Sequence, residues 1–466
     1  MLIQRIKLIN EIFTRGIMKT ILSKIKDLAL QHDQISPEVI KEKDVKIGLR
    51  NLDGTGVIVG ITTKGRVIGY DSMPDPNSPT GKKVIPTDGK LYYCGYDVND
   101  IIEYNEKHQR FGFEEVIYLL LTNTLPSRHD LGIFSTELHK RSKLTNLERR
   151  IIIGEVENFN QMYALHSVIS HLSRCDKNPD SIDISDVSEQ CINIIAKAPT
   201  VVANNYSVYK YRKGDDLRIS RSKDYLPMAQ NFLYMLTGRL PGIDEALIFD
   251  SCLILHAEHG GGNNSTFTVR TVSSSGVNTY MAIAAGIASL SGQFHGGANE
   301  SVMFMMKQCQ RDVKDWSNEN EIRGYLTRVL DKKAGDGRGK IYGMGHAVYT
   351  ISDPRTKILK RYAKFLAEKN NRIDLFNLFE MVEKIAPQLL EERKGNKTCV
   401  NVDFYSGLVY KFLGIPEILY TPVFAMARAA GWAAHRLEQI VQGKIIRPAY
   451  ISPHYEILEY EDIDGR

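Results

Sequence analysis

The chain has few cysteines and no long apolar segment. Its six cysteines are scattered through 466 residues without a C-x-x-C pair, which favours reduced thiols over a disulfide framework or a zinc site. The longest apolar run, residues 281–290, is about half of the ~20 residues that a helix needs to cross a bilayer. These absences argue against a disulfide-stapled small protein and a spanning helix, and we expect a cytoplasmic protein with no membrane partner.

A strong excess of one charge is also missing. The formal net charge is +5, and most of that excess lies in residues 1–30, so the rest of the chain is close to neutral. A nucleic-acid-binding protein normally carries a basic patch or stripe, and we therefore expect no nucleic-acid partner. With 43% hydrophobic and 25% charged residues, the composition is that of a globular protein of roughly two to three domains and excludes a disordered regulator.

The N-terminal end is basic, and its apolar residues lie at helical spacing. Residues 1–31 share these features with both an amphipathic helix and an organelle-targeting presequence. Glu11, Asp27 and the scarcity of serine favour the helix, because presequences are poor in acids and rich in serine. A targeting signal and a start at Met18 remain alternatives, and we assign residues 1–45 to an N-terminal helical extension.

Strand signals occur in two places before residue 100. Residues 57–70 are rich in β-branched side chains and are interrupted by Lys-Gly at 64–65, which predicts a β-hairpin with its turn there. Residues 90–93 follow an Asp-Gly turn signal at 88–89 and predict a second short extended piece. The rest of the chain has helical spacing almost throughout, so the predicted fold class is mainly α with a few short β-hairpins.

Helical periodicity is clearest in five segments. Leu125-Pro126 ends the first and Thr237-Gly238 the second. The fourth is built from alanine, glycine and serine, which lets neighbouring backbones approach closely. The fifth starts with threonine in the N-cap position and proline at the first helical position. The segments are residues 113–121, 228–236, 243–259, 280–291 and 421–439.

Three histidines stand beside glycines in one stretch of the chain. They are His259, His295 and His346. Glycine beside histidine removes side-chain bulk, so that a ligand can approach both the ring and the backbone. One such histidine alone is more often structural, but three in the same context indicate a site.

One acid and three arginines accompany these histidines. Asp403 lies between an extended piece and a helix, and Arg355 follows Asp-Pro, where proline sets the turn. Arg428 lies on an alanine-rich helix, and Arg447 precedes a proline. A guanidinium buried among apolar side chains needs an anionic partner. Histidines, arginines and one carboxylate together indicate a small polycarboxylate substrate and acid–base chemistry.

Other kinds of site fit the same residues less well. Residues 256–259 (HAEH) have neither the H-E-x-x-H nor the H-x-x-E-H zinc spacing, so we expect no metal. Residues 259–262 (HGGG) resemble the oxyanion loop of lipases, but the chain has no G-x-S-x-G. Residues 343–345 (GMG) lack the third glycine and the βαβ setting of a dinucleotide-binding fold.

Five motifs in the right order closely resemble the citrate synthase family, and two earlier ones, at 46–57 and 90–102, also look like its bacterial members. The similarity extends over about residues 46 to 450, nearly the whole chain. Several ordered motifs are far more specific than any single glycine pattern. The motifs are KIGLRNLDGTGV (46–57), KLYYCGYDVNDII (90–102), LHAEHGGGNNSTFTVR (255–270), GQFHGGANE (292–300), GMGHAVYTISDPR (343–355), NVDFYSG (401–407) and FAMARAAGWAAH (424–435).

This resemblance implies a mostly helical homodimer whose subunits have a large and a small domain. By analogy, residues 46–296 and 408–466 would form the large domain and residues 297–407 the small one. The implied reaction, in the tricarboxylic acid cycle, condenses acetyl-CoA with oxaloacetate and hydrolyses the product to citrate and CoA. CoA thioester is a substrate in this chemistry, and no cofactor is implied.

The resemblance also assigns roles to individual residues. Asp403 matches the base that removes a proton from the thioester methyl group, His295 the group that stabilises the enol oxygen, and His346 the group that polarises the oxaloacetate carbonyl. The residues that match the oxaloacetate-binding set are His259, Arg355, Arg428 and, contributed by the other subunit, Arg447. The segment that matches the CoA-binding loop includes Arg338, Lys340, Ile341, Tyr342 and Gly343.

The chain departs from the family pattern at Gly260, Cys94 and Gln293, where glutamate, arginine and proline are common. None of these changes removes a catalytic group, but Gly260 alters the lining of the site. A 2-methylcitrate synthase that uses propionyl-CoA would have the same residues, because one extra methylene discriminates by only ~1–3 kcal/mol in an apolar pocket. A catalytically silent, metabolite-binding paralogue is a further alternative. ATP-coupled citrate cleavage would need domains for which the chain has no room.

Overall fold

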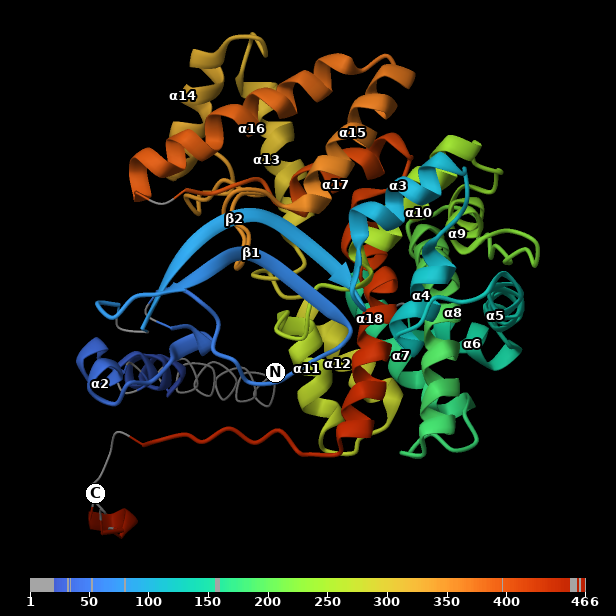
Figure 1. Cartoon of the computed structure of the whole chain (residues 1–466), viewed down its shortest axis with the longest axis horizontal. Coiled ribbons are helices and arrows are strands. Elements are labelled where there is room, and N and C mark those ends of the chain that lie inside the picture. The colour runs from blue at the N-terminus through green and yellow to red at the C-terminus, as the bar shows by residue number, and fades with distance from the viewer. Residues whose placement is uncertain are drawn as a thin grey trace, which may run out of the picture. The chain divides into compact units, whose positions relative to one another are not determined.

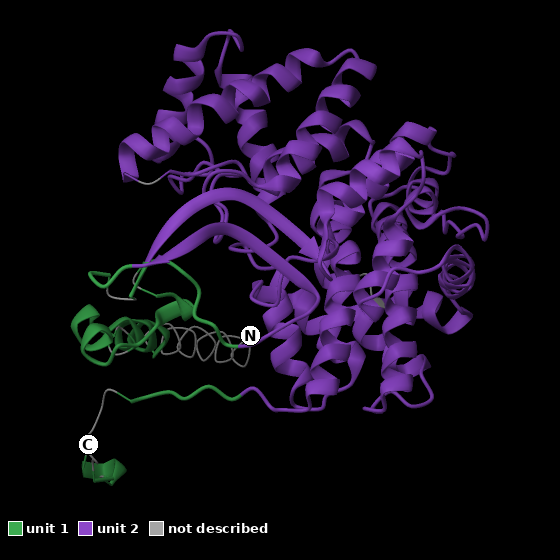
Figure 2. Ribbon diagram, in the orientation of Figure 1, with its two compact units in different colours: residues 1–59, 75–82, 447–466 green, residues 60–74, 83–446 purple. Residues whose placement is uncertain are grey.

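The computed structural model describes residues 21–31, 33, 35–51, 53–78, 81–155, 160–395, 397–452, 459–460 and 462–465. The chain divides into two compact units (Figure 2), and each is described here by itself. Unit 1 is drawn from residues 1–59, 75–82 and 447–466, and unit 2 from residues 60–74 and 83–446.

Unit 1 contains short helical elements. Residues 21–31 are helical, which confirms the expected helix over this stretch, whereas residues 1–20 of the predicted extension lie outside the described residues. Helix α2 (Pro37–Glu42) begins after Ser36, whose side chain accepts a hydrogen bond from the backbone of Val39 at 3.3 Å. The 3-10 helices η1 (Ile47–Leu49) and η4 (Ile463–Gly465) also belong to this unit.

Most of the chain is α-helical, as predicted (Figure 1). The strands are β1 (Gly65–Pro74), β2 (Lys82–Tyr93) and β3 (Tyr96–Asp97), in the sheet order β1-β2-β3. The helices after them are α3 (Val98–Lys107), α4 (Phe113–Thr122), α5 (Arg128–Arg141), α6 (Asn146–Glu155), α7 (Gln161–His171), η2 (Leu172–Cys175), α8 (Ile184–Arg212), α9 (Met228–Thr237), α10 (Ile243–Ala257), α11 (Asn264–Ser273), α12 (Thr279–Leu290), α13 (Ala298–Asp312), α14 (Glu319–Leu330), α15 (Pro354–Lys369), α16 (Ile373–Lys394), α17 (Val402–Phe412), η3 (Glu417–Leu419) and α18 (Tyr420–Gln442).

The expected position of the hairpin was wrong. Strand β1 begins at residue 65, where the turn was predicted, and strand β2 runs through residues 88–89 without turning. The Asp-Gly pair at 88–89 instead contacts Ser352. The backbones of Asp88 and Ser352 form an isolated parallel β-bridge, and the backbone N–H of Gly89 donates to the Ser352 hydroxyl at 3.2 Å. A local turn signal is thus used to bring β2 close to a distant loop.

Helix α18 is the central helix of the core. It packs against α4, α7, α8, α10, α11 and α12, and its Trp432 is fully buried. The small residues of α12 allow this packing, since a Cβ on Gly286 would lie 2.6 Å from the side chain of Val269. Close approach of the alanine- and glycine-rich helix was expected and is confirmed.

Helices α13 to α17 pack on one another, with α14 against α16 and α17 against α13 and α15. They lie together at the top of Figure 1. The predicted small domain, residues 297–407, covers α13 to α16 but ends inside α17. Its boundaries stay predictions, because both fall inside unit 2. None of the helices in the described ranges combines the length and apolar character required to span a membrane.

The predicted helix ends are confirmed for two helices and wrong for a third. Helix α4 stops at Asn123 and helix α9 at Gly238, both in the left-handed conformation that ends helices. Helix α18 instead starts at Tyr420, directly from η3, so Thr421 is not its N-cap. The Thr421 hydroxyl donates to the backbone carbonyl of Gly296 at 3.1 Å and is used for tertiary contact.

Candidate active site

His259 lies where α10 ends. The backbone becomes extended at Glu258, and the buried His259 ring then faces two other rings. Its centroid is 4.9 Å from that of His346 and 5.6 Å from that of Tyr349. The structure therefore brings two of the three predicted histidines together.

The loop that carries His346 is joined to the start of α17. Residues 343–345 pair with residues 399–401 through backbone hydrogen bonds of 2.8 and 2.9 Å and the bridge between Met344 and Val400. This pairing holds the His346 loop next to the first turn of α17, where Asp403 lies.

The hydrogen bonds of His346 determine which ring nitrogen can donate. Its Nδ1 accepts from the backbone N–H groups of Val348 at 3.0 Å and Tyr349 at 3.1 Å. A nitrogen that accepts carries no proton, so the proton of the neutral ring is on Nε2. His346 is thus prepared to donate from Nε2, and the Tyr349 ring stacked on it at 4.5 Å restricts its rotation.

His295 is oriented in the opposite sense. Its Nε2 lies 3.1 Å from the Ser265 hydroxyl oxygen and accepts from the backbone N–H of the same residue at 3.3 Å, and a ring nitrogen that accepts carries no proton, so the proton is on Nδ1. The Ser265 hydroxyl is itself used, because it donates to Asn263 at 2.8 Å and accepts from the Trp432 indole at 3.3 Å. Burial, and then the positive charge of Arg428, lower the pKa of His295 to about 4, so the ring is neutral and offers Nδ1–H.

Asp403 is the second residue of α17 and is half-buried. Burial raises its pKa to about 6, against the opposing effect of Arg355 and with a further contribution from Asp353. Its carboxylate is therefore ionised at neutral pH but far more basic than an ordinary aspartate, which suits a general base.

Arg355 is fixed by the residue that caps its helix. Asp353 accepts from the Arg355 backbone N–H at 3.1 Å and from Nε and Nη2 of its guanidinium at 2.9 and 2.7 Å. The same carboxylate accepts from the backbone N–H of Val402 at 3.2 Å, at the start of α17. One carboxylate thus aligns the predicted substrate arginine with the helix that carries Asp403.

Arg428 and His259 have buried polar atoms without a partner among the described residues. The Arg428 Nε donates to the carbonyl of His256 at 2.6 Å and its guanidinium lies 4.9 Å from the Phe424 ring centroid, but Nη1 makes no hydrogen bond there. The Nε2 of His259 is also buried and makes no hydrogen bond to a described residue. Other buried polar atoms also lack a partner among the described residues, but these two belong to residues of the predicted substrate-binding set and are available to a small polar ligand.

Burial also sets the charge of these two groups. It lowers the pKa of His259 well below its usual range, and the positive charge of Arg355 lowers it further, so the ring is neutral. Burial lowers the pKa of Arg428 to about 10, while the carboxylate of Glu258 opposes this shift. Arg428 therefore stays charged at neutral pH.

The predicted CoA segment lies beside this group of residues. Arg338 is exposed and its Nη1 donates to Gln293 at 2.9 Å, and Lys340 is exposed with its ammonium 5.3 Å from the Tyr342 ring centroid. Residues 341–343 are buried. Gln293, Arg338 and Tyr342 line a cavity of about 580 Å³. The assignment of CoA to this segment stays a prediction.

Arg447 is exposed and belongs to unit 1, whereas the other predicted site residues belong to unit 2. Its assignment to the oxaloacetate site of another subunit stays a prediction. Within the described ranges, no cluster of three or more histidine, cysteine or acidic side chains is arranged to hold a metal ion.

Sequence reasoning missed three residues that orient the predicted ones. Ser265 sets the tautomer of His295, Tyr349 stacks on His346, and Asp353 pairs with Arg355. Asp353 had a local signal, because aspartate before proline is a typical helix cap. Tyr349 lies only three residues after His346 but had no recognised signal, whereas Ser265 and His295 are 30 residues apart, a distance that no local pattern spans.

Comparisons with known proteins show which family this chain resembles. The family described as "Citrate synthase, C-terminal domain" matches residues 78–449. Citrate synthase of Haloferax volcanii is 36% identical over 383 residues, which cover 81% of this chain and 93% of that protein. Citrate/2-methylcitrate synthase of Bacillus subtilis is 32% identical, over 77% of this chain and 90% of that protein. The crystal structure of citrate synthase from Thermotoga maritima superposes with a TM-score of 0.70 at 26% identity, over 91% of this chain and 99% of that one.

Proposed function

This chain belongs to the citrate synthase family, and we propose that the site described above carries out the family reaction. The enzyme is an acyltransferase that condenses acetyl-CoA with oxaloacetate and hydrolyses citryl-CoA to citrate and CoA. The observation that carries the proposal is the pair of buried atoms without partners, Arg428 Nη1 and His259 Nε2. Oxaloacetate has the carboxylate and carbonyl oxygens that such atoms require.

Oxaloacetate binds among His259, Arg355 and Arg428. Arg355 is held by Asp353 in one orientation, so the substrate meets a guanidinium that is already positioned. A dianion in a buried site needs such cations, since charge-assisted hydrogen bonds are stronger than neutral ones. Fixing the ketone in this way lowers the entropy lost when the nucleophile attacks.

Enolisation of acetyl-CoA requires a base and a hydrogen-bond donor. Asp403 takes a proton from the methyl group, and its raised pKa improves its strength as a base. His295 donates from Nδ1 to the thioester oxygen as negative charge develops there. The His295 ring donates this hydrogen bond as a neutral imidazole, so no proton passes from it to bulk water.

Carbon–carbon bond formation requires a donor to the ketone. The Nε2–H of His346 polarises the oxaloacetate carbonyl and protonates the alkoxide as the enol carbon attacks. Water then cleaves the thioester, so that citrate and the CoA thiol are released. We propose that these steps need neither a metal nor a redox cofactor, and dialysis against EDTA should leave the rate unchanged.

The test is release of CoA thiol from acetyl-CoA, with and without oxaloacetate. We expect thiol release that depends on oxaloacetate. It should be lost in Asp403→Asn, a variant whose side chain keeps the same shape but cannot act as the base. Turnover retained in Asp403→Asn would contradict the assignment of the base. Binding of oxaloacetate without turnover of any acyl-CoA would indicate a metabolite-binding paralogue instead.

A second candidate is 2-methylcitrate synthase activity with propionyl-CoA. It is favoured by the similarity to the citrate/2-methylcitrate synthase of Bacillus subtilis. Comparing kcat/KM for the two thioesters separates the candidates, and faster turnover of propionyl-CoA would move the assignment to methylcitrate.

We also propose that the enzyme is a cytoplasmic homodimer in which Arg447 completes the partner's site and residues 338–343 meet CoA. Light scattering on the purified protein tests the dimer. Mixing inactive Asp403→Asn with inactive Arg447→Ala tests the shared site, because hybrid dimers would regain part of the activity.

A further inference from the structure

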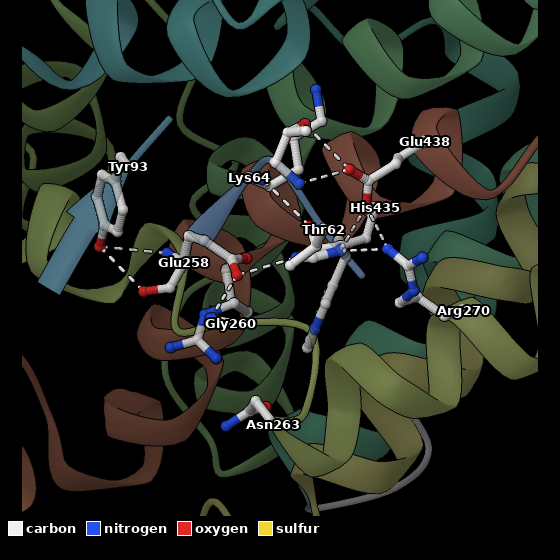
Figure 3. Close-up of polar contacts among 12 residues, drawn as sticks. Thr62, Lys64, Tyr93, Glu258, Gly260, Asn263, Arg270, His435 and Glu438 are labelled. Atoms are coloured by element: carbon white, nitrogen blue, oxygen red, sulfur yellow. Dashed lines mark hydrogen bonds and ion pairs between the residues drawn. The ribbon is translucent and has the colours of Figure 1, made fainter. Parts of the chain in front are cut away.

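Glu258 is a buried carboxylate next to the substrate pocket that the proposed chemistry does not use. Its side chain is fully buried and lies in a polar network with Gly260, His435, Arg270 and Glu438 (Figure 3). It follows the last residue of α10 and precedes His259 in an extended backbone, where successive side chains point in opposite directions.

One oxygen of Glu258 holds the turn that follows His259. Its Oε1 accepts from the backbone N–H of Gly260 at 2.6 Å and from Nε2 of His435 at 2.9 Å. Gly260 has a φ of +80°, a left-handed conformation that glycine adopts readily and that lets the chain turn directly after His259. A Cβ on either Gly65 or Gly431 would collide with the carboxylate. The absence of a side chain at these two glycines therefore leaves room for the carboxylate.

The partner of Glu258 is itself fixed. His435 Nδ1 accepts from Nη1 of Arg270 at 3.0 Å, so the His435 proton is on Nε2 and points to Glu258. Arg270 also forms an ion pair with Glu438 and donates to Gln442 at 2.9 Å. Glu258 is therefore anchored to α18 and α11 through groups that are already paired (Figure 3).

The carboxylate is ionised despite its burial. Burial raises the pKa of Glu258, but the pairing with His435, the charge of Arg428 and the Gly260 N–H outweigh it and lower the pKa below the usual range. An ionised, immobile carboxylate accepts strong hydrogen bonds from backbone N–H groups, so the bond to Gly260 is well suited to hold a turn.

We propose that Glu258 is a positioning residue, which through the Gly260 N–H sets the turn that places His259 against oxaloacetate. The inference rests on the proposed function, because it assumes that His259 binds this substrate. Its consequence is specific: loss of the carboxylate impairs oxaloacetate binding more than the chemical step, whose groups lie on other elements.

The experiment compares Glu258→Ala with a matched control, Asp250→Ala, in the full-length enzyme. Asp250 is also a buried carboxylate of α10, and it also accepts two hydrogen bonds, from the backbone N–H groups of Gly112 at 2.7 Å and Phe113 at 3.2 Å. Both variants should melt at lower temperature. Only Glu258→Ala should raise the oxaloacetate KM, by about 10- to 100-fold, since small misplacements in a site have effects of that order.

A conservative variant provides the rescue. Glu258→Gln keeps an oxygen that can accept from Gly260 and His435, so its oxaloacetate KM should return most of the way to the wild-type value. The kcat of both Glu258 variants should stay within about threefold of wild type. An unchanged KM in Glu258→Ala, or an equal rise in Asp250→Ala, would overturn the proposal.

A second variant keeps the test decisive where Glu258→Ala does not fold. His435→Asn withdraws the imidazole that fixes Glu258 and should raise the oxaloacetate KM about 3- to 10-fold; an unchanged KM would again overturn the proposal. Failure of the proposed function would look different, because wild-type enzyme would then release no thiol in the presence of oxaloacetate.

Discussion

Two buried arginines, Arg270 and Arg428, have opposite surroundings. Both Nη atoms of Arg270 donate to protein acceptors, among them Glu438, His435 and Gln442. Arg428 donates only through Nε to a backbone carbonyl, and its Nη1 has no partner among the described residues. A cation whose donors are satisfied stabilises the fold, whereas a cation with unused donors is available to a ligand and weakens the fold. The difference separates the polar network from the pocket.

The largest expected effect is that of Asp403→Asn in the pocket. It removes the base and should lower kcat by about 10²- to 10⁴-fold, while oxaloacetate still binds. Because the folded-state pKa of Asp403 is raised to about 6, the contribution of this carboxyl to wild-type stability falls as pH rises from about 4 to 6. The asparagine variant should therefore melt higher than wild type at pH 8. Thiol release, calorimetric binding and thermal melts check these points.

A melting temperature lowered by Asp403→Asn at pH 8 would contradict this interpretation, because it would mean that the carboxylate stabilises the fold. The same comparison at about pH 5 is the control. Asp403 is then mostly protonated in wild type, so the two proteins should differ less.

Exchanging each arginine for methionine tests directly whether Arg270 stabilises the fold and Arg428 binds the substrate. Arg270→Met leaves Glu438 without its ion pair and should lower the free energy of unfolding by about 3–5 kcal/mol. Arg428→Met should not lower it, because a buried cation with an unused donor weakens the fold. It should instead weaken oxaloacetate binding by about 10- to 100-fold through loss of a charged hydrogen-bond donor. Urea denaturation and calorimetric titration measure the two quantities. Equal stability losses, or weaker binding only in Arg270→Met, would break the comparison.

The pH profile separates the two titrating groups of the pocket. The kcat/KM for acetyl-CoA should fall as pH drops through about 6, because the protonated Asp403 carboxyl cannot accept a proton. His295, with its pKa at about 4, stays neutral across this range and adds no second limb. Rates from about pH 5 to pH 9 test this. A rate that stays constant down to pH 5 would exclude Asp403 as the base.

The smallest expected effect is that of Ser265→Ala. The backbone N–H that fixes His295 remains, so kcat should fall less than about tenfold. The free energy of unfolding should fall by about 1 kcal/mol, because the Trp432 indole loses its acceptor. Steady-state kinetics and urea denaturation measure both. A hundredfold loss of kcat would show that the hydroxyl, and not the backbone, orients the histidine.

The helical class and the end of α9 at Gly238 were predictable, because apolar spacing and glycine caps are local properties. Helix α4 ends at Asn123, before the Leu-Pro pair at 125–126 that was expected to stop it. The hairpin was misplaced because the Asp-Gly pair at 88–89 contacts Ser352, far away in the chain. Likewise the threonine at 421 has the sequence of a cap but bonds to Gly296. Local signals fail where a tertiary contact uses the same residues.

The sequence by itself determined the kind of chemistry: histidines beside glycines, a carboxylate and arginines on an alanine-rich helix indicate acid–base work on an anionic substrate. Only the tertiary structure decided which nitrogen of His295 donates, because the backbone N–H of Ser265, 30 residues away, reaches its Nε2. For His346 the local turn decides it, through the backbone N–H groups of Val348 and Tyr349. The tertiary structure also decided which buried arginine has a free donor. Tautomers and unsatisfied donors depend on the position of every neighbouring atom, and that information exists only once the chain is folded.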